Sequence, residues 1–280
     1  MKQHTLRQPL SFSGAGLHTG KPVNLRVSPA PVDAGIRFVR TDLQGAVVPA
    51  LVDCVGQTRR ATSLSYLGVK VLTPEHLLSA LSAMGVDNAL IELDAPEVPI
   101  LDGSARPYAE AIRATGLVEQ DAVRNSLVIE RSFVYEDRRS GSRIAFEPAG
   151  ETCIDVTIDF DSKVVGVQRA VFDATTDYVS QIAPCRTFCF LREVKPLLRL
   201  GLIKGGSLDN AIILHDGALI SKDGLRYPNE LVRHKIMDMV GDLYLVGKRV
   251  HAHIMSVKSG HPTHCKLAAL MLEQEAAAAK

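Results

Sequence analysis

The order of predicted secondary-structure elements repeats once along the chain, and this repeat constrains the fold more than any other feature of the sequence. In each half, strand-like segments lead to a long amphipathic helix, a further strand and a final helix. A histidine, His76 or His234, lies near the start of each long helix. The order predicts an α+β fold of two similar domains, each with sheets packed against helices, that face each other across a cleft.

The boundary between the halves is expected in the polar segment 119–125, where the strand pattern stops and then restarts. This gives an N-terminal domain of residues 1–122 and a C-terminal domain of residues 123–280. One helix is expected to have Thr73 as its N-cap, Pro74 and Glu75 in its first turn, and Gly85 at its end. Strands are predicted at 23–27, 36–40, 88–93, 126–129, 154–160 and 250–257, and further helices at 107–114, 231–246 and 264–276.

The overall composition excludes several functional classes. A net charge of +1 over 280 residues gives no electrostatic basis for binding nucleic acid. No apolar run approaches the roughly 18 residues of a transmembrane helix, and the polar N-terminus does not resemble a signal peptide. The odd count of five cysteines argues for free thiols rather than a disulfide framework. We therefore expect a cytoplasmic protein, and we expect it to be a monomer.

The second long helix carries His234, Asp238 and Asp242 at four-residue spacing, which places them on one face. This stripe has two interpretations: a solvated polar face, or a helix that chelates a metal through His234 and Asp238. The opposite face carries apolar residues that are expected in the core, namely Val232, Ile236, Met239, Val240 and Leu243.

Two further histidines have a chemically useful neighbour. Glu75 precedes His76 in the first turn of a helix, so a metal ligand and a carboxylate base could border one cavity. Glu75 is equally explained as an acid that favours a helix N-terminus. His261 lies on a glycine-containing turn and could act as a general acid held by Asp242, although a loop histidine of this kind also suits a plain surface position.

Seven short sequence motifs, in a fixed order along the chain, help to choose between these interpretations of the histidines and carboxylates. Together they resemble the UDP-3-O-acyl-N-acetylglucosamine deacetylases, the zinc amidases of lipid A biosynthesis, from about residue 5 to about residue 272. The motifs are Gly16-Leu17-His18-Thr19-Gly20, Thr73-Pro74-Glu75-His76-Leu77, Leu101-Asp102-Gly103-Ser104, Arg186-Thr187-Phe188, Lys204-Gly205-Gly206-Ser207, Val232-Arg233-His234-Lys235-Ile236-Met237-Asp238 and Lys258-Ser259-Gly260-His261.

The resemblance implies a catalytic Zn²⁺ bound by His76, His234 and Asp238, a ligand set that could also take Fe²⁺. The reaction it implies is removal of acetate from the 2-acetamido group of a UDP-3-O-acyl-N-acetylglucosamine. The implied catalytic residues are Glu75 as general base, His261 as general acid, Asp242 as the group orienting His261, and Thr187 as a hydrogen-bond donor to the substrate carbonyl oxygen.

The resemblance also implies contacts to the rest of the substrate. Lys235 and Lys258 would bind the diphosphate, and Asp159 and Phe160 the uridine. The segment 188–214, which begins with Phe188 and Phe190, would be an inserted unit forming an acyl passage. From the sequence alone, the leucines of this segment would simply be expected in an amphipathic core: Leu197, Leu198, Leu200 and Leu202.

The chain departs from the family pattern at two places. His264 and Cys265 stand where relatives often carry asparagine. They could place extra metal-binding groups near the site, but we expect them to be no more than residues at a helix start. The segment 61–63 lacks the cysteine that several relatives have there beside the active site, which removes a reactive thiol but no implied catalytic group. Two other functions remain open, a metal-dependent hydrolase of another amide and a non-catalytic UDP-sugar-binding protein. The second needs none of Glu75, His261 and the metal ligands.

Overall fold

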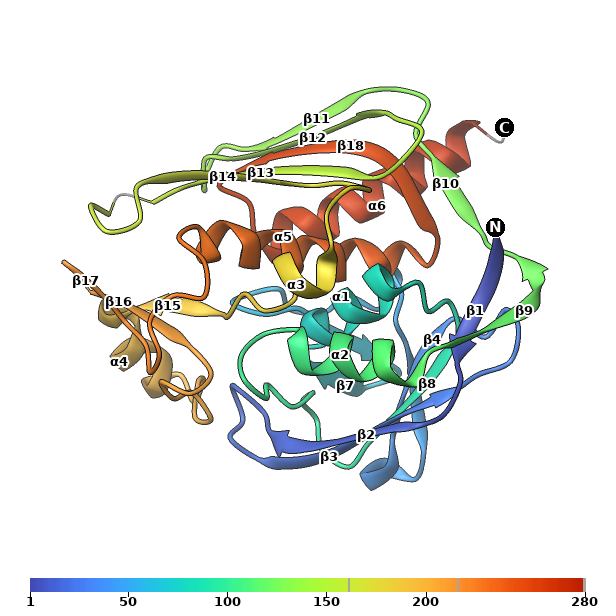
Figure 1. Ribbon diagram of the computed structural model, residues 1–280, viewed down its shortest axis with the longest axis horizontal. Coiled ribbons are helices and arrows are strands. Elements are labelled where there is room, and N and C mark those ends of the chain that lie inside the picture. Colours follow the sequence, from blue (N-terminus) through green and yellow to red (C-terminus); the bar gives the residue numbers. More distant parts are fainter. Residues whose placement is uncertain (161, 216, 279–280) are drawn as a thin grey trace.

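The structure is a computed structural model that describes residues 1–160, 162–215 and 217–278. Two large β-sheets form the outer layers, and two layers of helices lie between them (Figure 1). One sheet covers helices α1 and α2, and the other covers helices α5 and α6. The buried apolar side chains of both halves form one continuous core.

The first sheet is built from five strands in the order β2-β3-β8-β4-β5. Strand β8 is antiparallel to β3 and parallel to β4, and the helix that leads into β8 is α1. Alternation in β3 buries every second side chain, as the sequence pattern predicts. The elements of this half are β2 (Leu10–Ala15), β3 (Pro22–Pro29), β4 (Ile36–Arg40), β5 (Ala46–Pro49), α1 (Glu75–Met84), β8 (Ala89–Leu93) and α2 (Arg106–Thr115).

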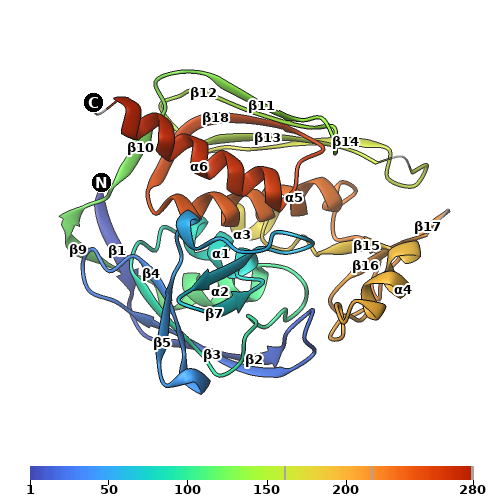
Figure 2. The ribbon, with the colours of Figure 1, turned by 180° about the vertical axis from the view of Figure 1, so that it is seen from behind.

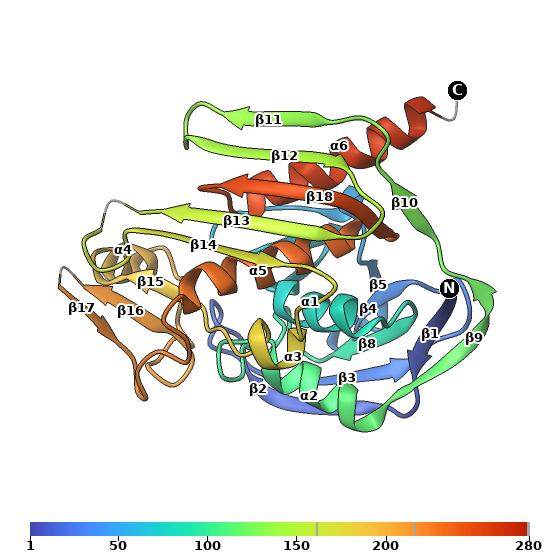
Figure 3. The same cartoon turned by 45° about the horizontal axis from the view of Figure 1, so that its top comes forward.

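The second sheet repeats this arrangement strand for strand (Figure 3). Its order is β11-β12-β18-β13-β14, with β18 antiparallel to β12, parallel to β13 and preceded by α5. Strand β10 adds to β18 in parallel. The elements are β10 (Ser126–Val128), β11 (Phe133–Asp137), β12 (Ser142–Pro148), β13 (Cys153–Asp159), β14 (Val167–Phe172), α5 (Glu230–Leu243), β18 (Arg249–Val257) and α6 (His261–Ala278). The predicted α+β fold of two similar units is confirmed.

Shorter elements connect and extend the two units. Strand β1 pairs with β9, so most of the polar segment expected to be a break is in fact a strand, whose backbone hydrogen bonds are satisfied by the N-terminus. The proposed division at residues 122 and 123 falls at the end of β9 and stays a prediction. The elements are β1 (Lys2–Leu6), β9 (Leu117–Val123), the hairpin β6 (Ser63–Tyr66) and β7 (Val69–Leu72), α3 (Tyr178–Gln181), and the 3-10 turns Thr41–Leu43, Val52–Cys54 and Tyr244–Val246.

The segment expected to be an insert projects from one side of the layers (Figures 1 and 2). It contains β15 (Phe188–Phe190), α4 (Leu191–Arg199) and most of β16 (Ile212–His215), and β17 (Ala218–Ile220) pairs with β16 beyond the predicted end at residue 214. Leu197 is buried, but Leu198 and Leu200 are 49% and 58% exposed. The expectation that these leucines belong to the core is therefore wrong for Leu198 and Leu200, because α4 packs on the rest of the chain along one narrow side only.

Helix α1 begins differently from the sequence prediction. Its N-cap is Pro74, while Thr73 adopts φ +54° and donates its hydroxyl to Glu97. Thr73 is therefore not the N-cap, because its side chain is already used by a buried carboxylate. Gly85 ends the helix in the left-handed conformation, as predicted.

Helix α5 is buried on nearly all sides, because the second sheet, α6 and α1 all pack against it. His234, Asp238 and Asp242 are at most 3% exposed, so the interpretation of this stripe as a solvated face is wrong. The approach of α1 to α5 depends on Gly241, since a Cβ there would lie 2.9 Å from the carbonyl carbon of Glu75. None of the described helices is long and apolar enough to cross a membrane.

Candidate active site

Three metal-ligating side chains meet where α1 packs on α5. His76 lies in the first turn of α1, and His234 and Asp238 lie one turn apart on α5. The Nε2 atoms of His76 and His234 are 3.7 Å and 3.4 Å from Oδ1 of Asp238. Ligand atoms bound tetrahedrally at about 2.1 Å from a metal lie about 3.4 Å from one another. These three side chains could therefore hold one metal ion.

The surroundings of these atoms also fit a cation. Oδ1 of Asp238 is buried and has no hydrogen-bond partner among the described residues. Nδ1 of His234 donates to the carbonyl oxygen of Cys185 at 3.1 Å, which leaves the lone pair on Nε2. Burial and the neighbouring His234 lower the pKa of His76 to about 3, so its ring is neutral. Neutral histidines and an unpaired carboxylate oxygen are the donors that a divalent metal needs.

Glu75 and His261 flank this cluster from two different helices. Nε2 of His261, the first residue of α6, lies 3.9 Å from Oε1 of Glu75 and 3.9 Å from Oδ2 of Asp238. Nδ1 of the same ring donates to Oδ2 of Asp242 at 2.8 Å. The carboxylate of Asp242 therefore fixes the ring so that Nε2 faces Glu75 and the metal-ligating cluster.

Burial and neighbouring charges move the pKa values of this pair in a direction that suits proton transfer. Burial raises the pKa of Glu75 to about 8, although His261 opposes the shift. Burial alone would lower the pKa of His261, but the carboxylates of Asp242, Asp238 and Glu75 raise it to about 9. A raised pKa makes the Glu75 carboxylate a stronger base and keeps the His261 ring protonated at neutral pH, so the pair offers one base and one acid.

Thr187 lines the cavity directly before β15, the strand that begins the insert. Its backbone N–H donates to the carbonyl oxygen of Gly103, and its carbonyl oxygen accepts from Ile212. Gly103 has φ +81°, and a Cβ there would collide with the backbone of Asn210. A glycine is therefore required at 103 for this close approach of three chain segments, and the segments hold Thr187 in the wall of the cavity.

Residues 3–273 match the family model of the UDP-3-O-acyl N-acetylglycosamine deacetylases. The chain belongs to this family. A UDP-3-O-acyl-N-acetylglucosamine deacetylase of Myxococcus xanthus is 45% identical over 267 residues, covering 95% of this chain and 84% of that protein. Proteins of the same name from Hahella chejuensis and Saccharophagus degradans are 42% and 43% identical, each covering 98% of this chain and 92% and 91% of the relative.

A cavity of about 390 Å³ opens beside the metal-ligating cluster. It contains ten of the site residues predicted from the sequence: Glu75, His76, Phe160, Thr187, Phe188, Phe190, His234, Lys235, Asp238 and His261. Phe160 packs edge-on against Phe188 and Phe190, with ring centroids 5.7 Å and 5.6 Å apart. The three rings form an apolar wall between the second sheet and the insert.

The remaining predicted residues lie outside this lining. Asp242 is fully buried behind His261. Lys258 and Asp159 are half-exposed and form an ion pair with each other at 2.9 Å. Lys235, within the cavity, donates to Oδ2 of Asp238 at 2.7 Å. Both lysines predicted to contact phosphate are therefore paired with carboxylates of this chain.

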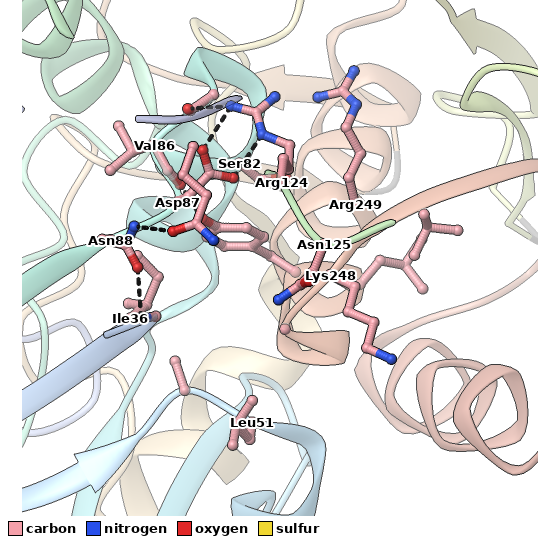
Figure 4. A pocket seen from close by; sticks show the side chains of 18 of the residues that line it. Ile36, Leu51, Ser82, Val86, Asp87, Asn88, Arg124, Asn125, Lys248 and Arg249 are labelled. Atoms are coloured by element: carbon pink, nitrogen blue, oxygen red, sulfur yellow. Dashed lines mark hydrogen bonds and ion pairs between the residues drawn. The ribbon is translucent and has the colours of Figure 1, made fainter. Parts of the chain in front are cut away.

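A second cavity of the described chain lies elsewhere. It has a volume of about 730 Å³ and borders the far ends of α1 and α5 (Figure 4). Its polar wall includes Arg124, which forms an ion pair with Asp87 and donates to a carbonyl oxygen at the end of α1. Arg124 lies in the segment that connects the two halves, so these bonds hold that segment against the end of α1. No cluster of metal-ligating groups was found around it in the described residues. The smaller cavity is therefore the candidate active site.

Two residues at the site escaped the sequence prediction. His264 lies in the first turn of α6, which begins at His261 and not at the predicted residue 264, and it donates its Nδ1 proton to Oδ2 of Asp242 at 2.9 Å. Its position three residues after His261, on the same helical face, was the available sequence signal. Thr62 contacts Asp242 as well. The family resemblance drew attention to the segment 61–63 only through the cysteine that several relatives have there beside the active site, and it gave Thr62 no role.

Proposed function

We propose that this chain hydrolyses the 2-acetamido group of UDP-3-O-acyl-N-acetylglucosamine, giving UDP-3-O-acyl-glucosamine and acetate in lipid A biosynthesis, with Zn²⁺ as its metal. The observation that carries the proposal is the meeting of three metal-ligating groups with the Glu75–His261 pair. The family and the names of its members support the substrate. Fe²⁺ would suit the same ligands.

His76, His234 and Asp238 would hold the metal. Zn²⁺ bound there supplies Lewis acidity, which lowers the pKa of water and polarises the amide carbonyl. Glu75 takes the proton from the attacking water, because its buried carboxylate is a stronger base than a solvated one. His261 then protonates the leaving nitrogen through Nε2.

The other residues orient and recognise the substrate in this proposal. Asp242 keeps the His261 ring in place, and the Thr187 hydroxyl donates to the carbonyl oxygen as negative charge develops on it. The uracil would stack on the wall formed by Phe160, Phe188 and Phe190, beside Asp159. Lys235 and Lys258 would bind the diphosphate by exchanging their present carboxylate partners for phosphate oxygens. The acyl chain would lie along the insert, residues 188–214.

The decisive experiment incubates the purified protein with UDP-3-O-acyl-N-acetylglucosamine and measures acetate release and the new amine. UDP-N-acetylglucosamine, which lacks the acyl chain, serves as the matched comparison. We expect release from the acylated substrate, a much lower kcat/KM for the comparison, and loss of activity on chelation of the metal. Binding without acetate release would point to a UDP-sugar-binding protein, and turnover of unrelated acetamides only would point to a hydrolase of another amide.

A further inference from the structure

Thr62, which immediately precedes β6, contacts two carboxylates of the proposed acid–base machinery. Its hydroxyl donates to Oδ1 of Asp242 at 2.6 Å, and its backbone N–H donates to Oε2 of Glu75 at 3.3 Å. Its carbonyl oxygen accepts from the N–H of Thr73, just before α1. Thr62 is 1% exposed, so water cannot replace these bonds without a change in packing.

The two carboxylate oxygens of Asp242 accept hydrogen bonds from different partners. Oδ2 accepts from the rings of both His261 and His264, and Oδ1 accepts from the hydroxyl of Thr62. The carboxylate is fully buried, so its orientation depends on these protein donors. Without the Thr62 hydroxyl, Oδ1 would lose its hydrogen bond, and the carboxylate would be free to turn away from His261.

The same residue also bridges the two halves of the fold. Glu75 belongs to α1 and Asp242 to α5, so Thr62 links the proposed base to the group that holds the proposed acid. The backbone bond to Thr73 fixes Thr62 relative to the start of α1, and the side-chain bond then fixes Asp242 relative to Thr62. Hydrogen bonds between protein groups thus connect Glu75 to His261 through Thr62 and Asp242.

We propose that Thr62 is a positioning residue for the deacetylation, acting through Asp242 on His261 and through its backbone on Glu75. The inference rests on the proposed function. A hydroxyl that orients a buried charged group contributes enough free energy for its loss to lower kcat roughly 10- to 100-fold. KM and metal content should change little, because the cavity lining and the three metal-ligating residues do not include Thr62.

The test compares Thr62→Val, which keeps the shape and the backbone bonds but removes the hydroxyl, with Thr62→Ser, which restores it. Ser63→Ala is the matched control, because among the residues that the structure describes the neighbouring Ser63 hydroxyl bonds only to the carbonyl oxygen of Gln57. We expect kcat to fall roughly 10- to 100-fold in Thr62→Val and to return within about threefold of wild type in Thr62→Ser. Ser63→Ala should match wild type in kcat and KM. A Thr62→Val enzyme with wild-type kcat would overturn the proposal, as would equal losses in the valine and serine variants.

A second readout is independent of turnover. The Nδ1 proton of His261, bonded to Asp242, should give a downfield NMR resonance that shifts or broadens in Thr62→Val and is restored in Thr62→Ser. An unchanged resonance would contradict the positioning role even if the wild-type chain released no acetate, whereas absent acetate release by itself would contradict only the proposed function. If the valine variant has a lowered Tm, Thr62→Ala is measured in its place against the same serine rescue.

Discussion

Replacing Gly241 with alanine should push apart the two helices that carry the metal-ligating residues. The added Cβ would lie 2.9 Å from the carbonyl carbon of Glu75, 3.1 Å from the amide nitrogen of Ser79, and closest of all to the carbonyl oxygen of Glu75. Real Cβ atoms essentially never approach another heavy atom closer than 3.0 Å. Because the opposing atoms are backbone, α1 as a whole must move, by about 1 Å.

Two opposing effects determine how much Gly241→Ala changes the free energy of unfolding. Alanine in a helix interior is favoured over glycine by about 1 kcal/mol. Overpacking of a close helix contact costs about 1–3 kcal/mol and more where backbone must shift. We expect a net loss of stability of about 2 kcal/mol. The catalytic effect should be larger, because a shift of about 1 Å between Glu75 and His261 costs roughly 100-fold in rate.

The assay combines thermal unfolding, metal content and acetate release for Gly241→Ala and for Gly150→Ala. Gly150 is exposed, and a Cβ there meets no heavy atom of the described residues within 4 Å, so this second variant controls for the substitution itself. Gly241→Ala should lower Tm by several degrees, weaken metal retention and reduce turnover strongly. Wild-type Tm and turnover in Gly241→Ala would refute the claim that the packing of α1 on α5 sets the geometry of the site.

Three further predictions concern proton transfer and charge. Glu75→Gln should keep the metal and lose most turnover; loss of the metal instead would make Glu75 a ligand. The rate of the wild-type enzyme should rise with pH as Glu75 loses its proton and fall again as His261 loses its proton, and a rate that is constant from about pH 5 to pH 9 would contradict this pairing. Burial acts to raise the pKa of Glu230, but hydrogen bonds from Arg186 hold this pKa below its ordinary value of 4.5. The Arg186–Glu230 pair therefore stabilises the fold fully above pH 4.5. This stabilisation is lost as the pH falls through the lower pKa that Glu230 has in the folded protein. Glu230→Gln should therefore cost about 3 kcal/mol at neutral pH and progressively less in acid, as measured by urea unfolding; a difference from wild type that stayed constant with pH would contradict this.

The local sequence pattern predicted the fold well where a local preference alone determines the structure. Period-two alternation located strands such as β3 and β4, and Gly85 correctly ended α1. The repeat of strands and long helix correctly predicted two similar units. The order of strands within each sheet could not be predicted, because it depends on pairing between segments far apart in sequence.

The failures arose where tertiary contacts override local preference. Thr73 was expected as an N-cap, but its hydroxyl bonds to Glu97, which follows β8 in the chain. The polar segment that contains Gln120 became a strand because the N-terminal strand pairs with it. Leu198 is exposed although its apolar character predicted burial. Each outcome depends on a partner that no local window contains.

Some residues of the candidate site could be predicted from local spacing, and others are brought there only by tertiary packing. The four-residue spacing of His234 and Asp238 on one helix indicated a candidate metal site, but it left open whether the two side chains chelate a metal or face solvent. Only the packing of α1 on α5 brings His76 to them. Thr62 reaches Asp242 from 180 residues away in the sequence, so its contact could not be foreseen from the pattern around it.

The central claim is that His76, His234 and Asp238 bind the metal on which deacetylation depends. Its most direct test is elemental analysis of the metal bound per chain, with acetate release measured on the same samples. We predict about one Zn²⁺ or Fe²⁺ per active wild-type chain, loss of both metal and activity in Asp238→Ala, and loss of activity alone in His261→Ala. Full metal content in Asp238→Ala, or full activity in metal-free wild type, would contradict the claim.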